Sequence, residues 1–245
     1  MKTKIYDTLR EKFITLIEEN SLESDAIIIR AAPLSAEEAI GRPSDRDYPL
    51  ITGRECLMQA EFRDCCGQAF TDMYDDYYGS LSGVVAIALG DNFQRAVFIA
   101  SLNAVMRYLG RVTKTVHCKD EEPRRCAAEL ADYVEKTYGR PRIALIGFQP
   151  RMVEALSPRF EIRVTDLDEK NIGTEKFGVV VCGPERTEEH LDWCDIALVT
   201  GTTIVNDTIE PMIRMTKDKE IIFYGTTISG AAELLDLKHF CHCGH

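Results

Sequence analysis

The stretch "RIALIGFQP" at residues 142–150 decides the fold. Four apolar residues run together and stop at Gly147, where a loop follows. The pattern of an apolar run followed by a loop recurs four times, at residues 160–166, 177–183, 195–201 and 220–225. Fully apolar strands joined by crossover segments are typical of a parallel sheet that is covered on both faces. The second half of the chain is therefore predicted to be a Rossmann-like α/β domain.

The first half has a different rhythm. Residues 1–20 carry apolar side chains at helical spacing, and the segments 81–90 and 93–110 predict two further helices that each end at a glycine. Residues 25–32 and 55–62 predict strands. A few strands followed by helices indicate an α+β domain.

The two patterns meet in the charged segment "HCKDEEPRRC" at residues 117–126, which contains Pro123. A helix closed by Gly139 is predicted directly after it. We therefore place the domain boundary there and predict domains at residues 1–122 and 123–245.

Composition limits the classes of partner. The formal net charge of −11 and the lack of a basic run argue against nucleic-acid and anionic-membrane partners. No apolar run reaches the roughly 18–20 residues of a membrane helix, and charges interrupt every apolar stretch near the start, unlike in a signal peptide. We expect a cytoplasmic protein whose nine cysteines are mostly free thiols.

Open parallel sheets bind ligands beyond the carboxyl ends of their strands. Two loops there share the motif Gly-Thr-Thr-Ile, in which glycine permits a close approach and threonine offers hydroxyl groups. The alternative is that these threonines only cap the helices that follow. The predicted ligand-binding residues are Gly147, Phe148, Gln149, Asp166, Thr200, Gly201, Thr202, Thr203, Asn206, Thr226 and Thr227.

Asp166 follows Gly147 by 19 residues, close to the spacing at which an acidic residue binds ribose hydroxyls in dinucleotide-binding domains. The glycine fingerprint itself is missing, because Pro150 replaces its second glycine. This argues against a standard NAD site and leaves a nucleoside-like ligand open. Asp166 as a residue of the strand-end turn is the alternative.

Three polar residues of the first half stand out within otherwise apolar patterns, and we name them as catalytic candidates: Asp72, Asn103 and His117. His117 or Asp72 would serve as general acid or base, and Asn103 would orient the substrate. A structural hydrogen bond is the alternative for Asn103. Direct partnership of His117 with Cys118 is disfavoured, because adjacent side chains diverge.

The last eight residues, "KHFCHCGH", offer Cys241, Cys243 and His245 as ligands for a soft divalent metal or a metal chelate. An extended tail would spread its alternating ligands over about 20 Å, whereas zinc ligands lie within about 2.0–2.3 Å of the metal. Such a tail would have to curl or combine with residues elsewhere. Otherwise Phe240 and Cys241 pack onto the body of the protein.

Several motifs together resemble an uncharacterised bacterial and archaeal family named for heavy-metal chelation. They are "IGRPSDRDYPLITGRE" (40–55), "GQAFTDM" (67–73), "FIASLNAVMRYLG" (98–110), "TVHCKDEEP" (115–123), "IALIGFQPRMVEAL" (143–156), "VTDLD" (164–168), "LVTGTTIVNDTI" (198–209) and "FCHCGH" (240–245). The resemblance implies an enolase N-terminal-like α+β domain, a Rossmann-like domain and a cleft between them. It supplies no catalytic residues.

Three functions stay open at this point. The resemblance implies an enzyme that condenses or hydrolyses a pterin-, flavin- or siderophore-like chelator. The alternatives are a metal- or chelate-binding protein without turnover and a transferase that uses an adenosylmethionine-like nucleoside ligand. Each takes a small molecule, which we expect to be polar or anionic, in the cleft. Whether the protein forms a homo-oligomer is left open.

Overall fold

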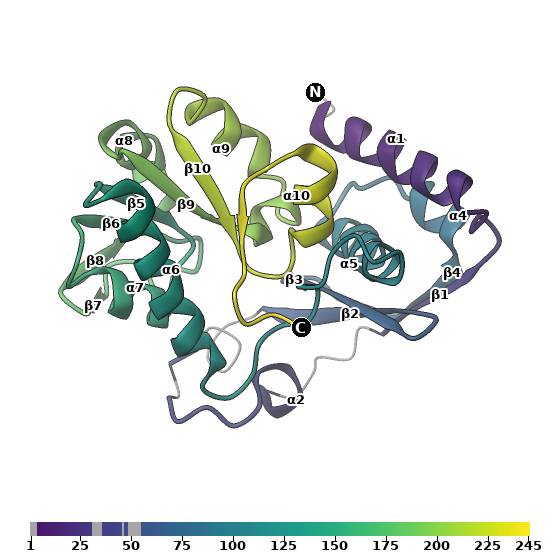
Figure 1. Ribbon diagram of the computed structural model, residues 1–245, viewed down its shortest axis with the longest axis horizontal. Coiled ribbons are helices and arrows are strands. Elements are labelled where there is room, and N and C mark those ends of the chain that lie inside the picture. The colour runs from purple at the N-terminus through teal and green to yellow at the C-terminus, as the bar shows by residue number, and fades with distance from the viewer. Residues whose placement is uncertain (1–3, 31–35, 46, 49–54) are drawn as a thin grey trace.

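The computed structural model describes residues 4–30, 36–45, 47–48 and 55–245. It contains an antiparallel sheet in the first half of the chain and a mostly parallel sheet in the second half, each with its own helices (Figure 1). The mixed α/β class predicted from the sequence is thereby confirmed. Residues 46 and 49–54 of the motif at residues 40–55 lie outside the described residues.

The antiparallel sheet has four strands in the order β3-β2-β1-β4. The longest helix of this half, α5, lies against β3 and β2. The elements of the first half are α1 (Lys4–Glu19), β1 (Ala26–Arg30), α2 (Ala36–Ile40), β2 (Cys56–Phe62), β3 (Cys65–Thr71), β4 (Tyr77–Ser80), α4 (Leu81–Val85) and α5 (Asn92–Tyr108).

Gly67 explains how closely α5 approaches the sheet. A Cβ atom at this position would lie 2.2 Å from the backbone nitrogen of Ala104 and 2.4 Å from the carbonyl oxygen of Ala100. Only glycine permits this contact between strand and helix. The predicted helix at 81–90 is shorter than expected, because α4 ends at Val85. The strands β3 and β4 were not predicted.

The parallel sheet has the strand order β11-β10-β9-β5-β6-β8-β7, in which only β7 runs antiparallel to its neighbour. All five apolar runs form strands, as predicted. The elements are α6 (Glu122–Tyr138), β5 (Ile143–Ile146), α7 (Pro150–Leu156), β6 (Ile162–Thr165), β7 (Glu175–Lys176), β8 (Val179–Cys182), η1 (Pro184–Arg186), α8 (Thr187–Trp193), β9 (Ile196–Thr200), η2 (Gly201–Ile204), α9 (Ile209–Met215), β10 (Glu220–Tyr224), α10 (Ser229–Leu235) and β11 (His239–Phe240).

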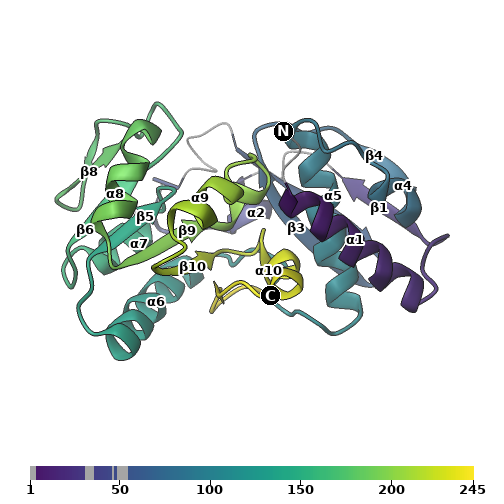
Figure 2. The ribbon, with the colours of Figure 1, turned by 90° about the horizontal axis from the view of Figure 1, so that it is seen from above.

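The two faces of the parallel sheet belong to different hydrophobic cores. Leu145 and Leu198 point into a core with α6 and α7. Val199 and Phe223 point into a second core that also contains Phe98 of α5. This second core is shared by the two halves, and Figure 2 shows α10 where they meet. The domain boundary near Pro123 stays a prediction, although α6 begins at Glu122, beside the predicted position.

The end of the chain returns to the segment that connects the halves (Figure 1). After β11, His245 donates its backbone N–H to the carbonyl of Val116 (2.9 Å) and accepts the N–H of Val116 (2.7 Å). Among the described residues, no helix has the length and apolar character that crossing a membrane requires.

Candidate functional site

A cleft of about 960 Å³ lies between the two halves of the molecule. Its wall includes the carboxyl ends of β5, β6, β9 and β10, together with residues of β3 and of the segment that leads into α6. The sheet order places β6 on one side of β5 and β9 on the other, so the chain reverses its direction of progress at β5. This is the position at which open α/β sheets bind ligands.

Most residues singled out in the sequence lie in the wall of this cleft. They are Asp72, His117, Gly147, Phe148, Gln149, Asp166, Thr200, Thr202, Thr203, Asn206, Thr226, Thr227 and Cys241. Four others do not line it, namely Asn103, Gly201, Cys243 and His245. The cleft therefore brings together predicted residues from both halves. That they bind a ligand stays a prediction.

Gly147 lets the loop after β5 pass directly beside β9. Its φ of +93° is unfavourable for other residues, and a Cβ atom there would lie 2.7 Å from Cγ2 of Thr200. Tyr224 donates its hydroxyl to the carbonyl of Gly147 (2.7 Å), and burial raises the pKa of this phenol. The Gln149 side chain caps α7 by accepting the N–H of Met152 (2.7 Å).

Asp166 holds this loop from the side of β6. One carboxylate oxygen accepts the backbone N–H of Phe148, and the other accepts the N–H of Asp168 (2.7 Å) and a weaker bond from Asn171 (3.3 Å). Burial raises the pKa of Asp166, and these hydrogen bonds oppose the rise. Asp166 lines the cleft beside Gly147, as a nucleoside site requires, but both of its oxygens already serve the loop.

Four of the threonines in the cleft wall use their hydroxyl groups within the protein. Thr200 Oγ1 lies 3.3 Å from Thr202 Oγ1, and Thr203 donates to the carbonyl of Thr200 (2.8 Å). Thr227 accepts the backbone N–H of Phe70 in β3 (3.1 Å), which connects the two halves. These contacts support the structural alternative for the four side chains.

Two other threonines of the cleft wall behave differently. The hydroxyl oxygens of Thr165 and Thr226 are buried and have no hydrogen-bond partner, although both residues line the cleft. A buried hydroxyl without a partner is costly, so such groups point to a missing ligand or water. Thr165, at the end of β6, was not among the predicted site residues, because its position next to Asp166 made it look like strand.

His117 lies in the cleft wall, in the segment that connects the two halves. Its ring packs edge-on against Phe70, with 5.3 Å between centroids, and its Nδ1 is buried without a partner. Burial lowers the pKa of His117 to about 4. The imidazole is therefore neutral at pH 7 and offers no charge to a ligand.

Glu55 is a member of the cleft wall that sequence reasoning missed. Its side chain meets the water in the cleft, but the surrounding walls remove much of its hydration. This desolvation, and then the negative charges of Asp166, Asp168 and Asp72, raise its pKa to about 7. Glu55 is the last residue of the motif at residues 40–55. No local sequence pattern there reveals its acidic neighbours.

Asn103 is fully buried in α5 and does not reach the cleft. Its amide nitrogen lies within hydrogen-bond distance of the carbonyls of Gln68 (3.0 Å), Thr226 (3.3 Å) and Thr227 (2.9 Å), and its oxygen accepts the N–H of Gly230 (2.8 Å). The structural alternative therefore accounts for this residue, and its geometry gives no support to a catalytic role.

Four cysteines gather beside the tail. Cys118, Cys126 and Cys243 are buried together, with Phe240 packed against them. The neighbouring Cys241 thiol is the main reason why the pKa of Cys126 is lowered to about 6. No local sequence pattern indicates that Cys118 and Cys126 lie beside the tail.

The predicted metal ligands Cys241, Cys243 and His245 do not surround one point. His245 turns away and contacts Glu122, with 2.9 Å between Nε2 and Oε2. Among the described residues, no group of three or more His, Cys, Asp or Glu side chains is arranged to hold a metal ion. Cys243 is buried in the tail with Phe240 packed against it. That single tail residues take part in metal binding stays a prediction.

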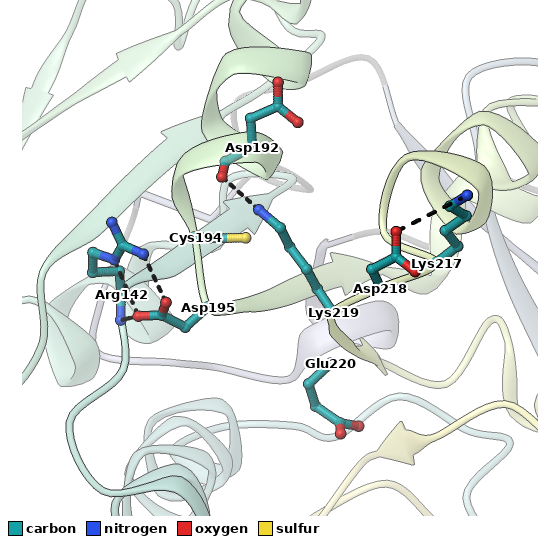
Figure 3. A pocket seen from close by; sticks show the side chains of 8 residues that line it. All are labelled: Arg142, Asp192, Cys194, Asp195, Lys217, Asp218, Lys219 and Glu220. Carbon is teal, nitrogen blue, oxygen red and sulfur yellow. Dashed lines mark hydrogen bonds and ion pairs between the residues drawn. The ribbon is translucent and has the colours of Figure 1, made fainter.

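A second hollow of about 730 Å³ lies at the opposite, amino-terminal edge of the sheet (Figure 3). Its basic groups already have partners within the protein. Arg142 pairs with Asp195 (2.7 Å), and the Lys219 ammonium group donates to the backbone carbonyl of Asp192 (2.5 Å). These contacts give no support to a ligand site.

Comparison with known proteins places the fold. Residues 129–240 match a family model described as "Putative heavy-metal chelation". Two crystal structures of proteins of unknown function from that family are similar in structure. One is from Pyrococcus horikoshii, with a TM-score of 0.58, 16% identity and coverage of 91% of this chain and 79% of that chain.

The other structure, from Desulfitobacterium hafniense DCB-2, has a TM-score of 0.57 and 12% identity, and the match covers 92% of this chain and 82% of that chain. No protein of curated function matches. Identities this low show the fold alone. The resemblance indicated by the sequence motifs is confirmed, because residues 129–240 match the model of the heavy-metal chelation family and both similar structures come from that family.

Proposed function

We propose that this protein binds a small molecule carrying positive charge, foremost a chelated metal cation, in the cleft between its halves. The observation that carries the proposal is the charge of the cleft wall. Lys170 is its one Lys or Arg among the described residues, and His117 is neutral at pH 7. The acidic residues of the wall are Glu55, Asp72, Asp166, Asp168, Glu169, Glu185 and Glu188.

A cleft with walls of one charge concentrates ligands of the opposite charge. The raised pKa of Glu55 is consistent with this negative potential. After desolvation, repulsion by three neighbouring carboxylates disfavours the charged form of Glu55. The sequence predicts a polar or anionic ligand, and an anionic one would be repelled here. A cation would relieve this repulsion.

The cleft also contains polar groups and aromatic surface that can contact the organic chelator around the cation. The unpartnered hydroxyls of Thr165 and Thr226 can each donate and accept a hydrogen bond, and Nδ1 of His117 is free of a protein partner. Phe70 and Phe148 supply aromatic surface beside them. Few polar groups within an apolar wall are typical of small-molecule sites.

Turnover of a chelator is a second candidate, and Glu55 is the observation that favours it. A carboxyl with a pKa of about 7 can both take and give a proton at neutral pH, as condensation or hydrolysis of a pterin-, flavin- or siderophore-like chelator requires. Asp72 is its neighbour across the cleft. Its carboxylate accepts the Asn92 amide (2.6 Å) and so has a fixed position.

The test uses two inert complexes of opposite charge, the cation tris(2,2′-bipyridine)cobalt(III) and the anion tris(oxalato)cobaltate(III), in calorimetric titrations of the full chain. We expect the cation to bind and the anion not to bind. Removing two cleft charges with Glu55→Gln and Asp72→Asn together should weaken cation binding about tenfold or more.

The matched control is the double variant Asp64→Asn with Asp218→Asn, which changes the net charge equally at exposed positions outside the cleft. This control should bind the cation as the native chain does. Equal weakening in both double variants would mean non-specific attraction to an acidic protein, and binding of the anion would contradict the proposal directly.

A further inference from the structure

The charged side chains of the cleft wall are concentrated at one end of the sheet edge. Lys170 lies in the loop after β6, and five carboxylates follow the strands β6 and β8, namely Asp166, Asp168, Glu169, Glu185 and Glu188. Beyond β9 and β10, the described residues of the wall include no charged side chain. Because the strands lie in the order β10-β9-β5-β6-β8, the cleft has an acidic end at β6 and β8 and an uncharged end at β10.

Two further carboxylates of the wall come from the first half. Glu55 is near enough to the carboxylates after β6 to feel their charges. Asp72 follows Phe70 of β3 by two residues, and Phe70 donates its backbone N–H to Thr227, which lies beyond β10 (3.1 Å). Negative charge therefore extends from the acidic end towards the middle of the cleft and does not include the loop after β10.

The uncharged end carries two polar atoms that the protein leaves without a hydrogen-bond partner. Thr226 is only 1% exposed, and its hydroxyl oxygen has no partner. Nδ1 of His117, a residue that is neutral at pH 7, is likewise buried and unpartnered. Phe70 brings these positions together, because its ring packs against His117 (5.3 Å between centroids) and its N–H bonds to Thr227.

Such an end favours an uncharged group of a ligand. A charged group would lose its hydration there and find no opposite charge, which is costly. A threonine hydroxyl can both donate and accept a hydrogen bond, and a nitrogen of a neutral imidazole can do one of the two. An uncharged group that donates and accepts, such as an amide, would satisfy both unpartnered atoms.

The distance between the two ends sets the length of the ligand. Thr165 is the last residue of β6, is 1% exposed and also has an unpartnered hydroxyl. Since β9 and β5 separate β10 from β6, Thr226 and Thr165 lie three strand spacings, or about 14 Å, apart. One compact group cannot reach both hydroxyls, whereas a linear molecule can.

We propose that the ligand of the cleft is an elongated molecule with a cationic group at the acidic end and an uncharged, amide-like group at Thr226 and His117. This inference rests on the proposed binding of a cation, and it adds the shape of the ligand and the chemistry of its second end.

The experiment titrates the full chain with two linear amines in a calorimeter at one low ionic strength. Spermidine is cationic at both ends, whereas N8-acetylspermidine has an uncharged amide at one end and one positive charge fewer. Attraction to an acidic cleft by charge alone favours spermidine. We expect the opposite order, with N8-acetylspermidine bound at least about threefold more tightly, because its amide reaches the unpartnered atoms.

Two variants locate the amide group. Thr226→Val removes the hydroxyl and keeps the shape of the side chain, and His117→Phe removes Nδ1 and keeps a ring against Phe70. Each should lower the preference for N8-acetylspermidine by about threefold or more. Glu188→Gln is the matched control at the acidic end, where the exposed carboxylate should attract both amines. It should weaken both amines and retain the preference.

Tighter binding of spermidine to the native chain, or a preference that Thr226→Val and His117→Phe both retain, would overturn the two-ended ligand. Circular dichroism establishes that each variant is folded, and if one of the two does not fold, the other decides. Binding of tris(2,2′-bipyridine)cobalt(III) without binding of either amine would overturn the elongated shape and leave the cation proposal standing. If none of the three cations binds, the proposed function fails and this inference fails with it.

Discussion

Asn103 Oδ1 accepts the backbone N–H of Gly230 at 2.8 Å, although the two residues lie 127 positions apart in the chain. The amide nitrogen of Asn103 faces the carbonyls of Thr226 and Thr227, in the loop that leads into the helix of Gly230. One buried side chain of the first half thus fixes the threonine loop after β10. The cleft is shaped by this contact, although Asn103 itself never reaches it.

Asn103→Asp should lower the free energy of unfolding by about 3–5 kcal/mol, because the new carboxylate would be buried against carbonyl oxygens and could not donate to them. Urea unfolding followed by circular dichroism measures this loss. Asn20→Asp, at the exposed end of α1, is the control and should change the free energy by less than about 1 kcal/mol. A comparably small loss in Asn103→Asp would contradict the structural role assigned to the amide.

Because the buried hydroxyl of Thr226 has no partner, we expect its removal not to destabilise the protein. Thr226→Val should leave the free energy of unfolding unchanged or raise it by about 1 kcal/mol, since it removes a buried polar atom without a partner. Thr115→Val is the matched comparison, because Thr115 is equally buried but donates to the carbonyl of Cys66 (2.7 Å). It should lose about 1–3 kcal/mol, and equal losses in both variants would show that the Thr226 hydroxyl is satisfied.

Glu55 should give the protein a characteristic dependence of stability on pH. Its pKa is raised from 4.5 to about 7 in the folded state, so between these values the folded state holds a proton that the unfolded state has lost. The contribution of Glu55 to stability is therefore full below pH 4.5 and declines as the pH rises towards 7. Glu55→Gln should remove this decline and be more stable than the native chain at pH 8.

Urea titrations of the native chain and the variant at several pH values isolate this contribution by difference. Cation binding should change in the opposite direction, strengthening as the pH rises through 7, because the deprotonated carboxylate attracts the cation. If the difference in free energy of unfolding between the two proteins does not vary with pH, the pKa of Glu55 is not raised. That result would contradict its placement beside the other cleft carboxylates.

Asp166→Ala should destabilise the protein by about 2–3 kcal/mol, because the N–H groups of Phe148 and Asp168 lose their acceptor in a buried loop. Asp168→Ala is the control, since its carboxylate accepts one bond, from the Lys170 N–H (3.0 Å), at an exposed turn. Denaturant titration again gives both values. If Asp166→Ala costs no more than the control, the carboxylate is free for a ligand, and the nucleoside hypothesis gains support.

Local sequence patterns were sufficient for five of the seven strands of the parallel sheet, because each of these five is a largely apolar run. The two-residue strands β7 and β11 carry no such pattern. Local patterns failed for β3, because Gly67 and Gln68 interrupt its apolar pattern. Gly67 permits the close approach of α5, and Gln68 hydrogen-bonds to Gln59 across the sheet. The loops at the strand ends could be predicted as cleft residues from topology. The partners of Asn103, the acidic neighbours of Glu55 and the meeting of four cysteines depend on long-range packing, which no local pattern records.

The hydrophobic core shared by the halves has a consequence for biosynthesis. The face of α5 that meets α10 is complete only when α10 is present, and α10 leaves the ribosome more than one hundred residues after Asn103. The emerging first half must therefore expose an apolar helix face, in which the Asn103 amide lacks its partners Thr226, Thr227 and Gly230, until the second half arrives. Folding during translation is thus delayed by the architecture, and chaperones have an opportunity to bind this helix in the interval.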